Sequence, residues 1–201
     1  MNHFSEIAKD WDTPQTLERN KIFSDALTKY VPNKTDLELL DFGCGTGLLS
    51  ESFALRADKL LGIDTTKEML EIFDKRFKNL ENTQSLCVNL EETPESLGDR
   101  FFDVIYTAMA FHHLKRPQRT LELFKKHLKN GGKVAVIDLD QEDGSFHPDN
   151  KAMGVHHYGF GRIELQSWAD ELKFKNFDHD IIHSIDKNGR IYRVALSLFS
   201  L

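Results

Sequence analysis

The sequence has few cysteines, no long apolar run and no compositional bias. Two cysteines, Cys44 and Cys87, are too few for a disulfide framework, which favours a reducing, cytoplasmic setting. No apolar run approaches the roughly 18 residues of a membrane span, and we expect no secretory signal at the N-terminus. With only 12 glycines and no repeat, the chain is not collagen-like. These absences exclude membrane-spanning, disulfide-stapled and fibrous proteins.

The charges also exclude one class of partner. The 26 Lys and Arg residues against 32 Asp and Glu residues give a formal net charge of −6, without a basic block. We therefore expect no nucleic-acid partner. A hydrophobic content of 40% and a length of 201 residues fit a single globular domain. Nothing in the composition indicates an oligomeric state.

Short apolar runs alternate with amphipathic stretches, which is typical of an α/β fold with a mainly parallel sheet. Two late strands flank Asn188-Gly189, a sequence that favours a tight hairpin turn. We therefore predict a doubly wound, mainly parallel seven-stranded sheet that ends in an antiparallel hairpin. The expected strands cover residues 37–42, 59–63, 84–88, 102–107, 133–138, 176–185 and 190–199.

The domain organisation follows from the same pattern. Residues 1–201 are expected to form one domain, with a helical cap over 1–35, an α/β core over 37–199 and a lid loop over 140–160. Pro14 is expected at the start of a cap helix, after Thr13 or Asp12. Residues 130–132, Asn-Gly-Gly, are expected to separate a helix from the fifth strand. Cys87 is expected to be a small buried residue.

A glycine-rich turn over residues 43–47 follows the first expected strand and is expected to open a helix through about Arg56. Glycines let the backbone turn sharply and approach a ligand, and a helix start offers free N–H groups. Asp64 ends the next strand, 21 residues after Gly43. Because these strand ends are adjacent in a doubly wound sheet, Asp64 can accept both hydroxyls of a ribose. The pattern predicts a site for a nucleoside-containing ligand.

Four segments together resemble the signature of class I S-adenosylmethionine-dependent methyltransferases, most closely the ubiquinone/menaquinone-methyltransferase-like group. They are Leu39–Gly47, Leu61–Asp64, Phe102–Ile105 and Ala110–Leu114. The resemblance covers roughly residues 37–199. It implies a Rossmann-like fold, S-adenosylmethionine as cofactor and methyl transfer to an acceptor that is expected to be a small molecule. It does not identify that acceptor.

The resemblance also implies roles for individual residues. Asp41, Gly43, Cys44, Gly45, Thr46 and Gly47 would lie against the methionine part of the cofactor. Asp64 would hold the ribose with Thr65 beside it, and Met69, Asn89 and Leu90 would lie near the adenine, although Met69 also fits a core position. Thr107 would lie near the methyl donor. Asn89 is neutral where the family often has an acid, so we expect modestly altered affinity, since an amide can still bond the adenine.

No catalytic residue can be assigned from the sequence, because a general base is needed only when the acceptor must lose a proton. His112 and His113 follow the fourth strand and could orient the substrate, or could simply pack there. His156 and His157 lie with His147 in the acidic 140–160 loop. Their spacing matches no standard metal site, so we expect no metal. The acceptor pocket is expected between this loop and the segment around Trp11.

Two other functions remain open at this point. A nicotinamide-dependent oxidoreductase would use a similar sheet and acid, but its turn prefers G-x-G-x-x-G, and Leu48 occupies the last glycine position here. A non-catalytic adaptor that keeps the methyltransferase fold is the second alternative. The intact glycine turn and Asp64 argue against it.

Overall fold

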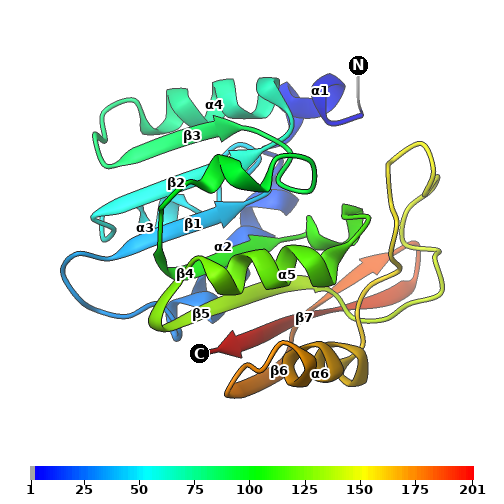
Figure 1. The fold of residues 1–201 in the computed structure, drawn as a ribbon. Helices are drawn as coiled ribbons and strands as arrows, with labels where there is room; N and C mark the ends of the chain where they lie inside the picture. The colour runs from blue at the N-terminus through cyan, green and yellow to red at the C-terminus, as the bar shows by residue number, and fades with distance from the viewer. Residues whose placement is uncertain (1–2) are drawn as a thin grey trace.

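A computed structural model describes residues 3–201 of the chain. Seven strands form one sheet in the order β3-β2-β1-β4-β5-β7-β6, with β7 antiparallel to both β5 and β6 (Figure 1). The strands are β1 Glu38–Phe42, β2 Lys59–Asp64, β3 Thr83–Cys87, β4 Phe102–Ala108, β5 Leu128–Leu139, β6 Asn176–Lys187 and β7 Arg190–Ser200. This confirms the predicted fold class, including the terminal hairpin, in which Asn188 and Gly189 both have positive φ.

Helices cover both faces of the sheet (Figure 1). They are α1 His3–Ile7, α2 Pro14–Thr28, α3 Glu51–Ala54, α4 Lys67–Phe77, α5 Pro117–Lys126 and α6 Arg162–Glu171, with short 3₁₀ helices η1 Ala8–Asp10, η2 Pro94–Leu97 and η3 Phe111–His113. As expected, α2 begins at Pro14, and its cap is Thr13, whose hydroxyl accepts the Thr16 N–H at 3.2 Å. No helix among residues 3–201 is long and apolar enough to cross a membrane.

The two faces of the sheet carry separate apolar cores. Successive residues of a strand point to opposite faces, so Val104 and Tyr106 of β4 pack on one side and Ile105 on the other. The first core includes Phe23 of α2 and Phe73 of α4, and the second includes residues of α5 and α6. The helices are therefore held by burial of one apolar stripe each, as the hydrophobic spacing indicated.

Three local predictions were wrong. The helix after the glycine turn is the single turn α3, because residues 48–50 form further turns before it. Strand β5 begins at Leu128, before the Asn-Gly-Gly segment, which stays in the strand at a break in register with β4. Cys87 is exposed, because β3 is an edge strand with only partial burial.

The order of the strands fixes where a ligand can bind. Strands β2 and β3 extend the sheet to one side of β1, and the chain then returns to place β4 on the other side. The connections after β1 and after β4 therefore leave in opposite directions and open a crevice at the carboxyl ends of these strands. Ligands of open α/β sheets bind at this point.

Gly47 tests how tightly the glycine turn packs against α4. Its φ is +85°, and a Cβ would lie 2.6 Å from a ring carbon of Phe77 and 2.7 Å from one of Phe73. We expect Gly47→Ala to lower the free energy of unfolding by about 1–2 kcal/mol for the backbone strain and by a further 1–3 kcal/mol, roughly, for overpacking. Chemical denaturation measures the loss.

The matched control is Gly189→Ala in the hairpin turn. Gly189 has a similar φ of +78°, but a Cβ there would have nothing within 4 Å. This variant isolates the cost of backbone strain. Equal losses in the two variants would contradict tight packing of the turn on α4.

Candidate functional site

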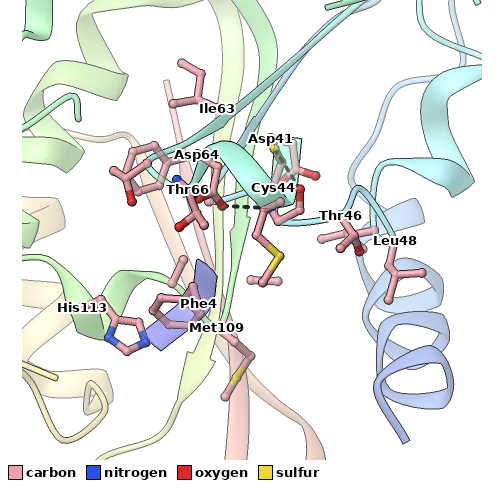
Figure 2. A pocket seen from close by; sticks show the side chains of 18 of the residues that line it. Phe4, Asp41, Cys44, Thr46, Leu48, Ile63, Asp64, Thr66, Met109 and His113 are labelled. Carbon is pink, nitrogen blue, oxygen red and sulfur yellow. Dashed lines mark hydrogen bonds between the residues drawn. The ribbon is translucent and has the colours of Figure 1, made fainter. Parts of the chain in front are cut away.

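A pocket of about 280 Å³ lies at the carboxyl ends of β1, β2 and β4. Figure 2 shows side chains from the glycine turn, from β2 and from the N-terminal segment facing it. All but two of the predicted cofactor residues line it. Those that do are Asp41, Gly43, Cys44, Gly45, Thr46, Asp64, Thr65, Met69, Asn89 and Leu90.

The glycine turn is fixed to the end of β2. The N–H groups of Gly43 and Cys44 both donate to the carbonyl oxygen of Ile63, at 2.7 and 3.0 Å. A Cβ on Gly43, whose φ is +70°, would lie 2.5 Å from the Cβ of Ala110. Only glycine therefore fits there, and the turn brings its backbone to the pocket wall.

Asp64 connects the turn to the helix after β2. One carboxylate oxygen accepts the N–H of Gly45 at 2.9 Å and the other accepts that of Thr66 at 2.8 Å. Burial raises the pKa of Asp64, although the backbone N–H groups of Thr66, Gly45 and Thr65 and the Thr66 hydroxyl oppose the shift. The carboxylate lines the pocket and is an acceptor, so it can take hydroxyl groups from a ligand there.

Asp41 sits beneath the turn in a buried polar network. Its carboxylate accepts the Ser50 hydroxyl at 2.6 Å, and Ser50 in turn lies 3.0 Å from the hydroxyl of Tyr106. Burial raises the pKa of Asp41 to about 7, and the nearby charge of Asp64 adds to this. Cys44 is also buried, which raises the pKa of its thiol well above the usual value, so the thiolate that a nucleophile needs does not form at neutral pH.

The other two predicted cofactor residues, Gly47 and Thr107, do not line the pocket. Gly47 lies against the rings of α4, and Thr107 is fully buried within β4. The lining near β4 comes from the residues after Thr107, including Met109, which has a φ of +55°. Positive φ is uncommon for a side chain of this kind and is often found at functional sites.

The N-terminal segment forms the other wall of the pocket, through Phe4, Trp11 and Phe23 among others. It is tied to the glycine turn by Asp12, which accepts the Thr46 hydroxyl at 2.7 Å and pairs with Arg76. Arg76 also donates its Nε–H to the Thr46 carbonyl at 2.9 Å. The expected position of Trp11 over the site thus agrees with the structure.

Arg19 is a lining residue that the sequence analysis missed. It lies on α2, its Nε is buried without a hydrogen-bond partner, and no carboxylate among residues 3–201 pairs with it. Burial lowers the pKa of its guanidinium, but the group stays charged at neutral pH. An unpaired cation at a pocket wall favours an anionic group of a ligand. One arginine on a helix carries no sequence signal for this role.

The candidate catalytic histidines occupy different positions. His113 lines the pocket, and its ring meets that of Phe4 edge-on at 5.2 Å. His112 is buried behind it with Nδ1 2.6 Å from Asp138, and the backbone N–H groups of His156 and His157 donate to the His112 carbonyl. No residue of the 140–160 loop is among the lining residues. The loop packs behind η3 and does not wall this pocket, so an acceptor pocket beside the loop stays a prediction.

The raised pKa of Asp41 predicts a pH dependence of stability. With a folded pKa of about 7 and an ordinary value of 3.8, the folded state binds more protons than the unfolded state between these pH values. Stability therefore falls as pH rises through this window, by at most about 1.4 kcal/mol per pH unit. Asp41→Asn keeps an acceptor for Ser50 and removes the ionisation.

The measurement is the free energy of unfolding of the ligand-free protein by denaturant between pH 5 and 8. We expect Asp41→Asn to gain stability relative to the parent as pH rises toward 7, and the difference to level off above that. Parallel curves for the two proteins would contradict a protonated, buried Asp41.

Comparison with known proteins identifies the kind of enzyme. A sequence family described as a methyltransferase domain matches residues 40–136, which include the glycine turn, Asp64 and β4. An uncharacterized methyltransferase of Schizosaccharomyces pombe is 25% identical over 98% of this chain and 94% of its own length. A ubiquinone biosynthesis O-methyltransferase of Coxiella burnetii is 27% identical over 90% of this chain and 83% of its own.

A solved structure adds support for the fold. The plantazolicin methyltransferase BpumL, in complex with S-adenosylhomocysteine, superposes with a TM-score of 0.71 over 97% of this chain and 89% of its own, at 17% identity. That likeness concerns the fold, and the sequence relatives carry the activity. They do not support the oxidoreductase or the non-catalytic adaptor. The chain is a class I S-adenosylmethionine-dependent methyltransferase.

Proposed function

We propose that the chain methylates a small-molecule acceptor and that the pocket described above holds the cofactor. The observation that carries this proposal is the N-terminal segment over the site, where Phe4 and Trp11 complete a small, partly closed pocket. A protein or nucleic-acid substrate would have to displace this segment and its link through Asp12. A small molecule reaches the pocket without doing so.

Each part of the cofactor has a matching group in the pocket. Asp64, whose carboxylate lines the pocket, accepts the ribose hydroxyls. Met69 and Leu90, both buried apart from the pocket wall, pack on the adenine. Asn89 uses its amide NH₂ there, because its side-chain oxygen already accepts the Glu91 N–H at 3.0 Å. Arg19 pairs with the carboxylate of the methionine part.

The chain contributes mainly alignment and exclusion of water. When bound, S-adenosylmethionine supplies an electrophilic methyl group on a positively charged sulfur. The turn and Arg19 would hold the methionine end of that molecule and Asp64 its ribose, so these residues would orient it toward the acceptor. Phe4 and Trp11 keep water from the reacting atoms.

His113 is the strongest of the four candidate histidines, since only it lines the pocket. Burial and the neighbouring His112 lower its pKa to about 4, so it is neutral at pH 7 and presents an uncharged ring to the pocket. Relatives named for ubiquinone biosynthesis point to an O-methyl acceptor as one class to test. We also propose that the protein is located in the cytoplasm, as the low cysteine content suggests.

The role of Arg19 is tested with two ligands. S-adenosylhomocysteine carries the amino-acid carboxylate, whereas methylthioadenosine lacks it. We expect Arg19→Ala to weaken binding of S-adenosylhomocysteine at least about tenfold, the equivalent of about 1.4 kcal/mol, and to leave the affinity for methylthioadenosine unchanged. Calorimetry measures both affinities.

Asp64→Ala is the matched control in this test. It removes the ribose acceptor, which both ligands need, so both affinities should fall at least about tenfold. Equal effects of Arg19→Ala on the two ligands would rule out a carboxylate contact. Unchanged affinities of the Asp64→Ala variant for both ligands would contradict the proposed contact between Asp64 and the ribose.

The acceptor class is tested by following labelled methyl groups. Purified protein with methyl-labelled S-adenosylmethionine is incubated with a cell extract, which is then separated into small molecules, protein and nucleic acid. We expect label in the small-molecule fraction, and Asp64→Ala to reduce it in proportion to the lost affinity. Label confined to protein or nucleic acid would overturn the proposed acceptor class.

A further inference from the structure

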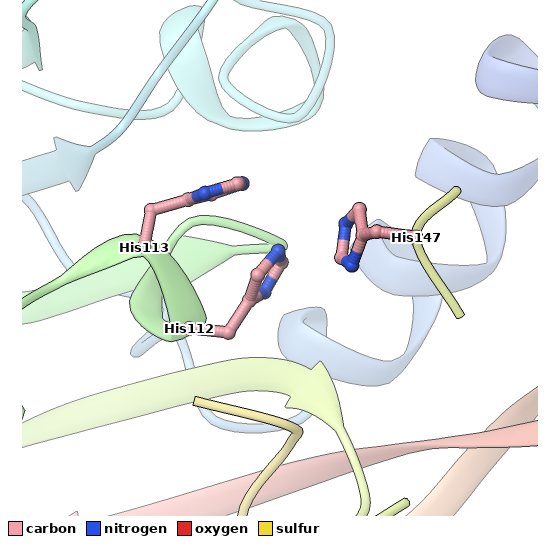
Figure 3. A group of neighbouring side chains, drawn as sticks. All are labelled: His112, His113 and His147. Carbon is pink, nitrogen blue, oxygen red and sulfur yellow. The ribbon is translucent and has the colours of Figure 1, made fainter. Parts of the chain in front are cut away.

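Three histidines from two distant segments meet beside the pocket. His112 and His113 belong to η3, and His147 comes from the 140–160 loop, 34 residues further along the chain. One ring nitrogen of each lies within 4.8 Å of those of the other two. Figure 3 shows the three rings turned toward a common space. His147 lies near His156 and His157 in the sequence, but the structure does not bring His156 or His157 into this cluster.

His112 presents a lone pair with no partner. Its Nδ1 lies 2.6 Å from Asp138, whose carboxylate also accepts the backbone N–H groups of His112 and Leu139. Because this carboxylate accepts from its neighbours, Nδ1 of His112 is the ring nitrogen that donates to it, and in the neutral ring Nε2 carries the lone pair.

That lone pair is buried. His112 is 1% exposed, and Nε2 makes no hydrogen bond to any residue from 3 to 201. Simple packing would have let a ring N–H of His147 donate to it, since the two ring centroids are 5.0 Å apart, but no such bond forms. A buried acceptor without a partner costs free energy and calls for a ligand that supplies one.

The ring of His113 is oriented in a matching way. Nδ1 of His113 lies 3.1 Å from the carbonyl oxygen of Gly154, which can only accept, so in its neutral form His113 also keeps its lone pair on Nε2. His147 is half-buried in the loop, and its ring centroid lies 5.0 Å from that of His112. A neutral imidazole is the form that coordinates a metal.

We propose that His112, His113 and His147 form a binding site for one divalent transition-metal ion of the zinc type. Neutral imidazoles are common ligands of such ions, and an aspartate that orients a ligating histidine from behind, as Asp138 does, is a usual accompaniment. Three protein ligands leave a fourth position of a tetrahedral ion open. Because His113 also lines the pocket, that position adjoins it.

The cluster needs only a modest change to close on an ion. Two nitrogens bound to a tetrahedral zinc at about 2.0–2.1 Å lie about 3.4 Å apart. His147 can supply this movement by side-chain rotation, because it is partly exposed and lies in a loop. His112 and His113 are held more firmly, by Asp138 and by the carbonyl of Gly154.

The test is a zinc titration of untagged, chelator-treated protein by calorimetry, with cobalt(II) absorption as a second probe. We expect one ion per chain and cobalt absorption bands of a tetrahedral, nitrogen-ligated site. His147→Gln is expected to weaken zinc binding at least tenfold and to abolish those bands. His127→Gln is the matched control, since His127 lies before β5, at the end of the sheet away from the pocket, and bonds only a backbone carbonyl.

Two further measurements keep the outcome clear. Zinc should raise the thermal midpoint of the parent and of His127→Gln but not of His147→Gln, while all three share one midpoint without metal. S-adenosylhomocysteine should bind all three, so loss of the metal site is separate from loss of the cofactor site. No zinc binding by the parent, or equal weakening in both variants, would overturn the proposal.

Discussion

One carbonyl oxygen, that of Ile63 at the end of β2, organises the cofactor side of the molecule. It accepts the N–H groups of both Gly43 and Cys44, which bends the chain after β1 across the end of its neighbour. The next residue, Asp64, continues the arrangement by accepting the N–H of Gly45. The turn is therefore shaped by β2 and not by the helix after it. This explains why a single helical turn, α3, suffices there.

The same constraint separates two roles of the glycines. Gly43 must lack a side chain because Ala110 approaches it at the pocket wall, and Gly47 because two rings of α4 pack on it. In the sequence, Gly43, Gly45 and Gly47 form a single motif. In the structure its first member lies at the pocket wall, and its last member packs against a helix. The motif thus encodes the position of α4 as well as the shape of the pocket wall.

The limits of the sequence analysis follow from distance along the chain. The fold class and most lining residues could be predicted because they depend on local periodicity and on adjacent strand ends. The positions of Arg19 and His147 depend on how a cap helix and a long loop pack onto the finished sheet, which no local pattern records. Thr107 shows a smaller limit, since the pattern placed it at the end of the fourth strand but did not show that β4 opens into the pocket only after it.

The cap and the histidine cluster meet at one side chain, His113. Its ring touches Phe4 of the cap on one side and, with centroids 4.1 Å apart, His112 on the other. The cap is anchored by the burial of Phe23 and Leu27 of α2 in the first core. Nearer the pocket it has the polar links of Asp12 with Thr46 and Arg76, which contribute little individually at a partly exposed surface. The contact of Phe4 with His113 adds to these links at the pocket. If an ion on the cluster fixes His113, it also fixes one support of the cap. By thermodynamic reciprocity, any change that the ion makes to cofactor affinity equals the change that the cofactor makes to ion affinity.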